Sequence, residues 1–191
     1  VNNIRLSLQQ KYYYILLNKP KDYISTSSDE KGRKTVLDLI NFPDIPRLYP
    51  IGRLDRNTTG VLLLTNDGEL THFLTHPSSV VLKEYFVVLD RPISDFDFNK
   101  LQTGITVDDI LVKASNVLLD ENNYKNIIIS IHYGKYHIVR KMFEALEYDI
   151  ESLDRISFAG INKKGLLRGK WRFLTQRELS HLKNLMIKKK K

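Results

Sequence analysis

Short apolar runs that end at turn residues constrain the fold of this chain more than any other feature. Tyr12 to Leu17 is an apolar and aromatic run that ends before Pro20, and Val61 to Leu64 ends at the turn Asn66-Asp67-Gly68. Runs of this length between turn signals are typical of buried β-strands. The same pattern predicts further strands at residues 80–89, 111–119, 126–133, 153–158 and 171–174.

Helices are predicted between these strands. Ser94 can cap a helix that runs to Gln102, and Thr175-Gln176-Arg177-Glu178 is a capping box that opens a terminal helix. Residues 136–147 carry apolar side chains at helical spacing, and shorter helices are expected at 35–40 and 69–75. Strands with interspersed helices and short connections predict the α+β class, with a mixed, largely antiparallel sheet and flanking helices.

The composition indicates a basic protein without cysteine chemistry. The 191 residues are enough for one large domain, and the formal net charge of +8 favours a polyanionic partner, with nucleic acid ahead of an anionic membrane. The chain has no Cys, which excludes disulfides and thiolate zinc sites and fits a cytoplasmic location. No apolar run approaches the ~20 residues that span a bilayer, so we expect no membrane partner.

The polar loop before Val61 carries the strongest chemical signal. It places Asp55 between Arg53 and Arg56. Neighbouring positive charges favour the ionised form of a carboxylate, and an ionised, positioned Asp can act as a nucleophile on a sugar carbon. The arginines indicate that the sugar carries phosphates. From the residues alone, the loop indicates a carboxylate nucleophile in a basic cleft, with a turn-capping role for Asp55 as the alternative.

Common phosphate and metal motifs do not fit this loop. A P-loop needs Gly-Lys-Ser/Thr, whereas Gly60 is followed by Val61. The loop matches the first positions of a calcium-binding EF-hand but has Asn66 where that motif requires Glu. His132 and His137 have no clear third ligand, so we interpret their spacing as incidental. No metal or cofactor is expected.

Five ordered segments resemble one protein family. The loop from Gly52 to Gly68 is similar to the signature loop of the RsuA/RluB-type ribosomal RNA pseudouridine synthases. The other segments follow in that family's order and bring the resemblance to roughly residues 12–180: Tyr14–Pro20, Val81–Val87, Gly134–Met142 and Gly169–Thr175 with Glu178.

The resemblance implies an isomerase that converts a uridine of ribosomal RNA into pseudouridine by base flipping, without cofactor or metal. It implies a bent sheet with a central cleft, and Asp55 as the nucleophile; attack on the ribose and attack on the base both stay open. Tyr85 matches the residue that stacks on the uracil and is the candidate to take its C5 proton. Arg140 matches the arginine that pairs with the nucleophile, and Arg53 the arginine that fills the space left by the flipped nucleotide.

Other basic residues are candidates for contacts with the RNA backbone. Such contacts add affinity and salt dependence but do not read sequence. The candidates are Lys19, Arg56, Lys83 and Lys135.

The chain departs from the family pattern just before Arg140. Relatives usually carry Glu before Gly134, and Arg followed by Gln or Glu where this chain has His137-Ile138. Lys141 replaces a second Arg and loses bidentate capacity. These differences weaken any inference about which uridine is chosen, but not the assignment to isomerisation.

The resemblance also predicts a domain division. Residues 1–10 are expected to be the remnant of an upstream linker, residues 11–187 the catalytic domain, and residues 188–191 a solvated basic tail. Family members of this branch usually carry an S4-type RNA-binding domain before the catalytic domain, so we expect one upstream in the full-length protein. We expect a monomer.

Two other functions remain to be distinguished. One is a non-enzymatic ribosome-assembly factor that keeps the fold and binds RNA. The other is a hydrolytic enzyme that cleaves glycosidic bonds with Asp55 and Asp67 as paired carboxylates.

Overall fold

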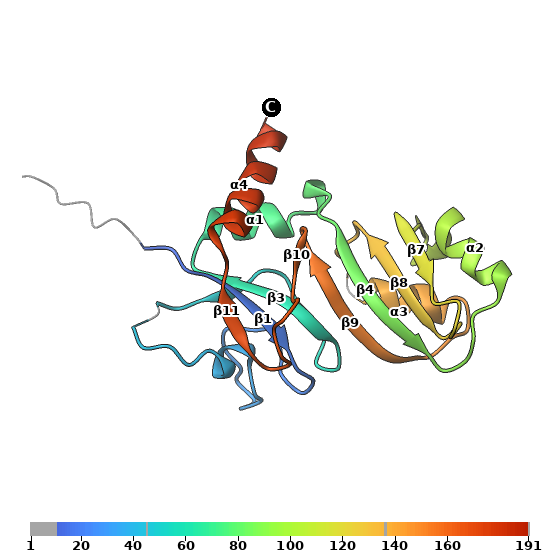
Figure 1. The fold of residues 1–191 in the computed structure, drawn as a ribbon, viewed down its shortest axis with the longest axis horizontal. Coiled ribbons are helices and arrows are strands. Elements are labelled where there is room, and N and C mark those ends of the chain that lie inside the picture. The colour runs from blue at the N-terminus through green and yellow to red at the C-terminus, as the bar shows by residue number, and fades with distance from the viewer. Residues whose placement is uncertain (1–10, 45, 136, 191) are drawn as a thin grey trace, which may run out of the picture.

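The central sheet of the molecule is mixed and largely antiparallel (Figure 1). The structure is a computed structural model that describes residues 11–44, 46–135 and 137–190. Within these residues the strands run in the order β11-β1-β3-β9-β4-β8-β7, with β2 beside β3 and β10 beside β9. Among the named strands of the described residues, only β3 and β9 pair in parallel, through Thr59 with Asp154 and Gly60 with Arg155. The strands are β1 (Tyr14–Lys19), β2 (Tyr49–Pro50), β3 (Thr59–Thr65), β4 (Lys83–Leu89), β7 (Asn116–Leu119), β8 (Asn126–Ile131), β9 (Ile150–Phe158), β10 (Ile161–Asn162) and β11 (Trp171–Phe173).

Helices flank both halves of this sheet. In Figure 1, α4 and α1 lie together beside the β11-β1-β3 half, and α2 and α3 accompany the β4-β8-β7 half. The helices are α1 (Gly68–Thr75), α2 (Asp95–Thr103), α3 (Ile138–Glu144) and α4 (Gln176–Lys190), with short 3₁₀ turns η1 (Val36–Leu39) and η2 (Pro77–Ser79). Among the described residues, no helix combines the length and apolarity needed to cross a bilayer.

The central strand β3 is apolar throughout because both of its faces are covered. Leu62 and Leu64 belong to one buried cluster, whereas Val61 and Leu63 point to the opposite face and belong to a second cluster. Successive side chains of a strand alternate between faces, so a strand covered on both sides needs a continuous apolar run. The second cluster includes Leu182, which docks α4 onto the sheet.

Local hydrogen bonds confirm the predicted helix starts. The Ser94 side chain accepts a hydrogen bond from the backbone N–H of Asp97 at 3.1 Å. At the start of α4, the Glu178 carboxylate accepts from the Thr175 N–H at 2.8 Å, and the Thr175 hydroxyl accepts from the Glu178 N–H at 3.2 Å. This reciprocal pair is the capping box read from the sequence.

The predicted strand 111–119 is wrong as a single element. It is divided into β6 (Ile110–Val112), which pairs with β5 (Ile105–Val107) in a separate ribbon, and β7, which pairs with β8. The N–H of Ala114 donates to the carbonyl of Leu101 at the end of α2, and this bond turns the chain between the two strands.

Other boundaries shift where the backbone takes a left-handed conformation. His137 has φ +54° and precedes α3, so the helix predicted from 136 begins at Ile138; Tyr136 lies outside the described residues. Val80 has φ +47° and β4 starts only at Lys83. Residues 188–190 continue α4; residues 1–10 and 191 lie outside the described residues.

Candidate active site

Hydrogen bonds from the Lys19 side chain hold the backbone of the loop that carries Asp55. The Lys19 side chain is fully buried at the end of β1. Its Nζ donates to the backbone carbonyls of Thr58 at 2.8 Å, Asp55 at 3.0 Å, Pro20 at 3.1 Å and Arg56 at 3.3 Å. Burial lowers the pKa of Lys19 to about 8, opposed in part by the charge of Asp55. The expectation that Lys19 contacts the RNA backbone is wrong, because its ammonium group is buried and donates its hydrogen bonds to backbone carbonyls of the loop.

Ser25 also holds this loop, through hydrogen bonds to the backbone of Leu54. The Ser25 hydroxyl donates to the carbonyl of Leu54 at 2.9 Å and accepts from the N–H of Leu54 at 3.1 Å. Ser25 and Leu54 are both buried. The backbone immediately before Asp55 is therefore held at two polar groups, and the carboxylate starts from a fixed position.

The Asp55 carboxylate faces two basic side chains and a hydroxyl. Nε2 of His137 lies 2.8 Å from Oδ1, and Nε of Arg140 lies 3.7 Å from Oδ2. The Thr58 hydroxyl donates to Oδ2 at 3.4 Å and accepts from Nη2 of Arg140 at 3.4 Å. The carboxylate stays 30% exposed, so it is oriented by its partners and still open to a ligand.

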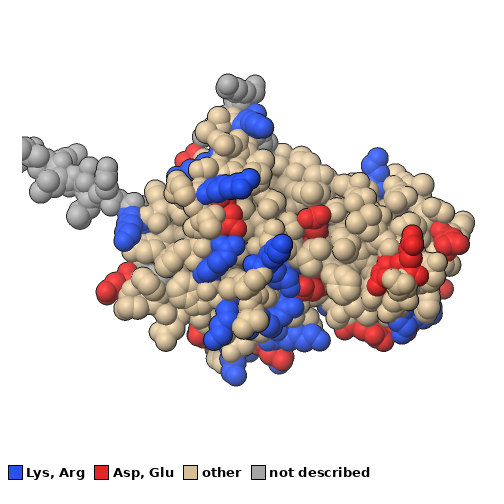
Figure 2. All heavy atoms as spheres, viewed as in Figure 1, with Lys and Arg blue, Asp and Glu red and all other residues tan. Residues whose placement is uncertain are grey.

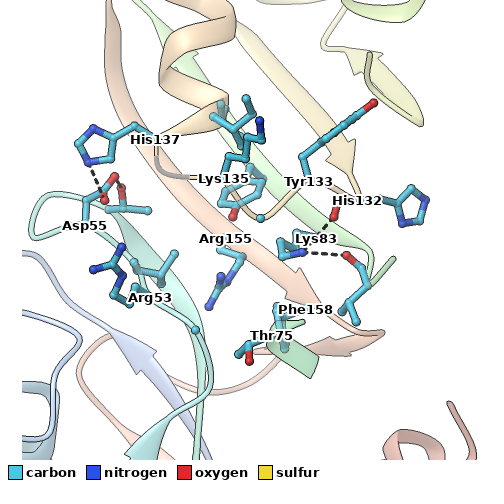
Figure 3. A pocket seen from close by; sticks show the side chains of 18 of the residues that line it. Arg53, Asp55, Thr75, Lys83, His132, Tyr133, Lys135, His137, Arg155 and Phe158 are labelled. Atoms are coloured by element: carbon cyan, nitrogen blue, oxygen red, sulfur yellow. Dashed lines mark hydrogen bonds and ion pairs between the residues drawn. The ribbon is translucent and has the colours of Figure 1, made fainter. Parts of the chain in front are cut away.

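A pocket of about 290 Å³ begins at this carboxylate (Figure 3). Tyr85, from strand β4, lines it and is itself buried. The lining contains six of the eight candidate residues read from the sequence, namely Asp55, Tyr85, Arg140, Arg53, Lys83 and Lys135. The structure thus brings together in one cavity the three residues to which the resemblance assigns chemistry.

A more open groove of about 900 Å³ adjoins the pocket. The two cavities share Arg53, Asp55, His137 and Arg140, so the carboxylate lies where they meet. Arg56 lines only the groove, where its guanidinium pairs with Asp22 at 2.9 Å on the surface. A ligand bound in the pocket would therefore leave the groove open to a larger part of the same molecule.

On the face of the molecule drawn in Figure 2, basic side chains are concentrated in one part. Figure 2 shows Lys and Arg gathered over the half that contains β11, β1 and β3, whereas acidic side chains dominate the end with α2. Such a field attracts a polyanion to one half of the molecule and raises its rate of encounter.

Two residues of the pocket were missed by sequence reasoning. His137 was interpreted as incidental, yet it comes closer to Asp55 than Arg140 does. Arg155 carried no signal, because a basic residue within an alternating strand ordinarily faces solvent; here it is 2% exposed.

Lys83 lies in the pocket rather than on the surface, and its Nζ donates to the carbonyls of Val81 at 2.9 Å and His132 at 3.3 Å.

Comparison with known proteins decides the family. The family model described as RNA pseudouridylate synthase matches residues 13–145. The chain belongs to this family. Ribosomal large subunit pseudouridine synthase B of Bacillus subtilis (strain 168) is 39% identical over 190 residues, which cover 97% of this chain and 77% of that protein. The resemblance to RsuA/RluB-type synthases is therefore confirmed.

Further relatives support the same assignment. A protein of Aquifex aeolicus (strain VF5), described as an uncharacterized RNA pseudouridine synthase, is 37% identical over 177 residues, or 91% of this chain and 70% of that protein. A crystal structure of a pseudouridylate synthase matches 90% of this chain and 74% of its own with a TM-score of 0.80 and 30% identity. The α+β fold expected for a pseudouridine synthase is confirmed.

Membership among the pseudouridine synthases makes the chain an isomerase and disfavours both alternatives. The hydrolytic alternative also needs Asp67 beside Asp55. The Asp67 carboxylate instead accepts from the Leu70 N–H at 3.0 Å as the cap of α1 and from the Tyr14 hydroxyl at 2.8 Å. It belongs to the lining of neither cavity, so it does not form a carboxylate pair with Asp55.

Proposed function

We propose that this protein converts a uridine of ribosomal RNA into pseudouridine, with Asp55 as the nucleophile acting on a flipped nucleotide. The observation that carries the proposal is the position of the Asp55 carboxylate. It lies at the mouth of a pocket lined by Tyr85 and beside an open groove, with His137 and Arg140 facing it.

The chemistry needs an ionised carboxylate and no external reactant. Substrate and product contain the same atoms: the bond from C1′ to N1 breaks, a bond from C1′ to C5 forms, C5 loses a proton and N1 gains one. Asp55 bonds transiently to the nucleotide while the uracil detaches, rotates and reattaches. His137 at one carboxylate oxygen, and Arg140 and the Thr58 hydroxyl at the other, keep the Asp55 carboxylate aimed when a ligand displaces water.

Tyr85 supplies the second element of the proposed mechanism. It lies on β4, faces the pocket and is 8% exposed, so its ring offers a fixed apolar surface. A uracil ring can stack on such a surface, which offsets part of the cost of unstacking from its RNA neighbours. In this account the Tyr85 hydroxyl is the candidate acceptor of the C5 proton.

Arg53 is positioned to support base flipping. It lines both cavities, next to the nucleophile, and therefore stands where an RNA strand would pass from groove to pocket. A side chain inserted into the space left by a flipped nucleotide offsets a cost of a few kcal/mol. Arg56, Lys83 and Lys135 are proposed to contact the RNA backbone from the groove and the pocket.

The substrate class follows from the chain's relatives and from charge. The Bacillus subtilis relative is described as acting on the large ribosomal subunit, and the net charge of +8 suits a polyanion. We propose that the protein acts as a monomer in the cytoplasm. The S4-type domain expected upstream stays a prediction.

Incubation of the purified protein with ribosomal RNA transcripts tests the function. Carbodiimide labelling and primer extension would locate pseudouridine, and chromatography would measure free uracil. We expect one new pseudouridine signal, or very few, and no free uracil. RNA binding without pseudouridine would favour the assembly factor, and released uracil would favour hydrolysis; either result would contradict the proposal.

A further inference from the structure

Arg155 is a buried cation whose hydrogen-bonding capacity is only partly used. It lies on β9, lines the pocket and is 2% exposed. Its Nε donates to the carbonyl of Val61 at 2.8 Å, whereas its Nη2 is buried and has no hydrogen-bond partner among the described residues. Figure 3 shows the side chain extending into the space between Arg53 and Phe158. A buried, charged donor without an acceptor costs free energy unless a ligand supplies one.

A second cation lies beside it. Lys83, on the adjacent strand β4, lines the same pocket. Both cations approach the ring of Phe158, with Cζ of Arg155 4.8 Å and Nζ of Lys83 5.8 Å from its centroid. Burial and, to a smaller extent, the charge of Arg155 together lower the pKa of Lys83 to about 8. Two like charges repel more strongly in this enclosed setting than in water.

Among the described residues, no carboxylate forms an ion pair with either of these two cations. None of the ion pairs among residues 11–44, 46–135 and 137–190 includes Arg155 or Lys83. Asp154, which precedes Arg155, points to the other face of the sheet and pairs with Lys163 and Arg168. The floor of the pocket therefore carries excess positive charge, and an anion would relieve it.

We propose that Arg155 and Lys83 form a subsite that binds one backbone phosphate next to the target uridine. This inference rests on the proposed function. A backbone phosphate carries one full negative charge, which would offset part of the charge of the two cations, and its oxygens match the planar guanidinium. A neutral uracil carbonyl would leave the repulsion between the cations uncompensated.

The position of Tyr85 indicates which phosphate is bound. Tyr85 pairs directly with Arg155 across β4 and β9, and adjacent strands lie about 4.8 Å apart. A nucleotide whose base stacks on Tyr85 therefore brings one of its own two flanking phosphates to the guanidinium. The subsite would fix the ribose relative to Asp55, so Arg155 and Lys83 would act through binding of the substrate.

A cycle of protein and RNA changes tests the subsite. Once the target uridine is mapped, RNAs with a single neutral methylphosphonate on its 5′ or its 3′ side are compared with unmodified RNA. Dissociation constants are measured for the wild-type protein, Arg155→Gln and Lys83→Met. Lys113→Gln is the control, because Lys113 is exposed and lines neither cavity.

We expect one of the two methylphosphonates to weaken wild-type binding roughly 10- to 100-fold, the range for a charge-assisted hydrogen bond. Arg155→Gln should lose a similar factor on unmodified RNA and little more on that modified RNA, because protein and RNA changes remove the same contact. Lys83→Met should behave in the same way, and Lys113→Gln should keep the full sensitivity of the wild type.

Two results would overturn the subsite. One is wild-type binding that is insensitive to both methylphosphonates. The other is that, in Arg155→Gln and in Lys83→Met, the methylphosphonate weakens binding by the same factor as in the wild type. Circular dichroism checks folding, and if Arg155→Gln fails to fold, the Lys83→Met cycle and the wild-type sensitivity decide. Absence of pseudouridine with wild-type protein would instead refute the proposed function, whereas pseudouridine formation with independent losses would refute the subsite alone.

Discussion

Nε2 of His137 lies 2.8 Å from Oδ1 of Asp55, while Nε of Arg140 approaches Oδ2 only to 3.7 Å. His137 reaches this position because it takes a left-handed conformation, with φ +54°, immediately before α3. The carboxylate is thus held between a residue at the start of α3 and one a turn further along it.

His137→Ala is expected to lower the rate of pseudouridine formation about 10-fold while RNA affinity stays near the wild-type value. Loss of one hydrogen bond to a charged group costs about 1.5–3 kcal/mol, part of which water recovers at this half-exposed site. Single-turnover rates measure the effect. His137→Gln, which keeps a hydrogen-bond donor, is the matched control and should recover part of the rate. Equal rates for wild type and His137→Ala would show that His137 does not contribute to the reaction.

Lys19→Met is expected to lower the free energy of unfolding by about 3 kcal/mol, because several buried carbonyls lose their donor. Urea denaturation measures this change. The salt dependence of RNA binding should keep its slope, since a buried ammonium releases no counterions from RNA. A shallower slope in folded Lys19→Met would show that Lys19 contacts phosphate after all.

The free energy of unfolding should rise as pH increases from about 8 to 9.5. Burial lowers the pKa of Lys19 and of Lys83 to about 8, below the ordinary lysine value of 10.5, so the unfolded chain binds more protons in this interval. Above about pH 10.5 the trend should reverse, because the unfolded lysines have then lost most of their protons, whereas burial and the bond to Asp67 raise the pKa of Tyr14 in the folded protein. Urea denaturation across this range measures the trend, and Lys19→Met should flatten the rise. A flat profile for the wild type would contradict this reading.

Gly60→Ala is expected to destabilise the protein by more than about 3 kcal/mol or to prevent folding. Gly60 has φ +109°, and an added Cβ would lie 2.1 Å from the carbonyl oxygen of Arg155. The parallel contact between β3 and β9 depends on this close approach. Thermal denaturation provides the measurement. Gly68→Ala, where a Cβ meets nothing within 4 Å, is the control and should fold with little change in stability; similar stability for both variants would argue against the constraint.

Local sequence signals predicted much of the fold. The run Val61 to Leu64 became the central strand, and the caps at Ser94 and Thr175 formed as read, because each depends only on residues close in sequence. The break between β6 and β7 was missed because it depends on a hydrogen bond from Ala114 to Leu101, which no local pattern reveals.

The same distinction holds at the site. The charge and spacing of its residues identified the loop around Asp55 as a candidate site, and the family resemblance indicated Tyr85 and Arg140. Lys19 was misread because charge in a sequence carries no information about burial. Arg155 escaped notice because its neighbours in the pocket come from β3 and β4, far from it in the chain.

The release of tritium from ribosomal RNA labelled at C5 of uridine tests the central claim most directly. Asp55→Asn keeps the shape of the side chain and removes its nucleophilic oxygen. We expect this variant to bind RNA nearly as tightly as the wild type and to release no tritium above background. Tritium release at the wild-type rate from Asp55→Asn would show that Asp55 is not the nucleophile.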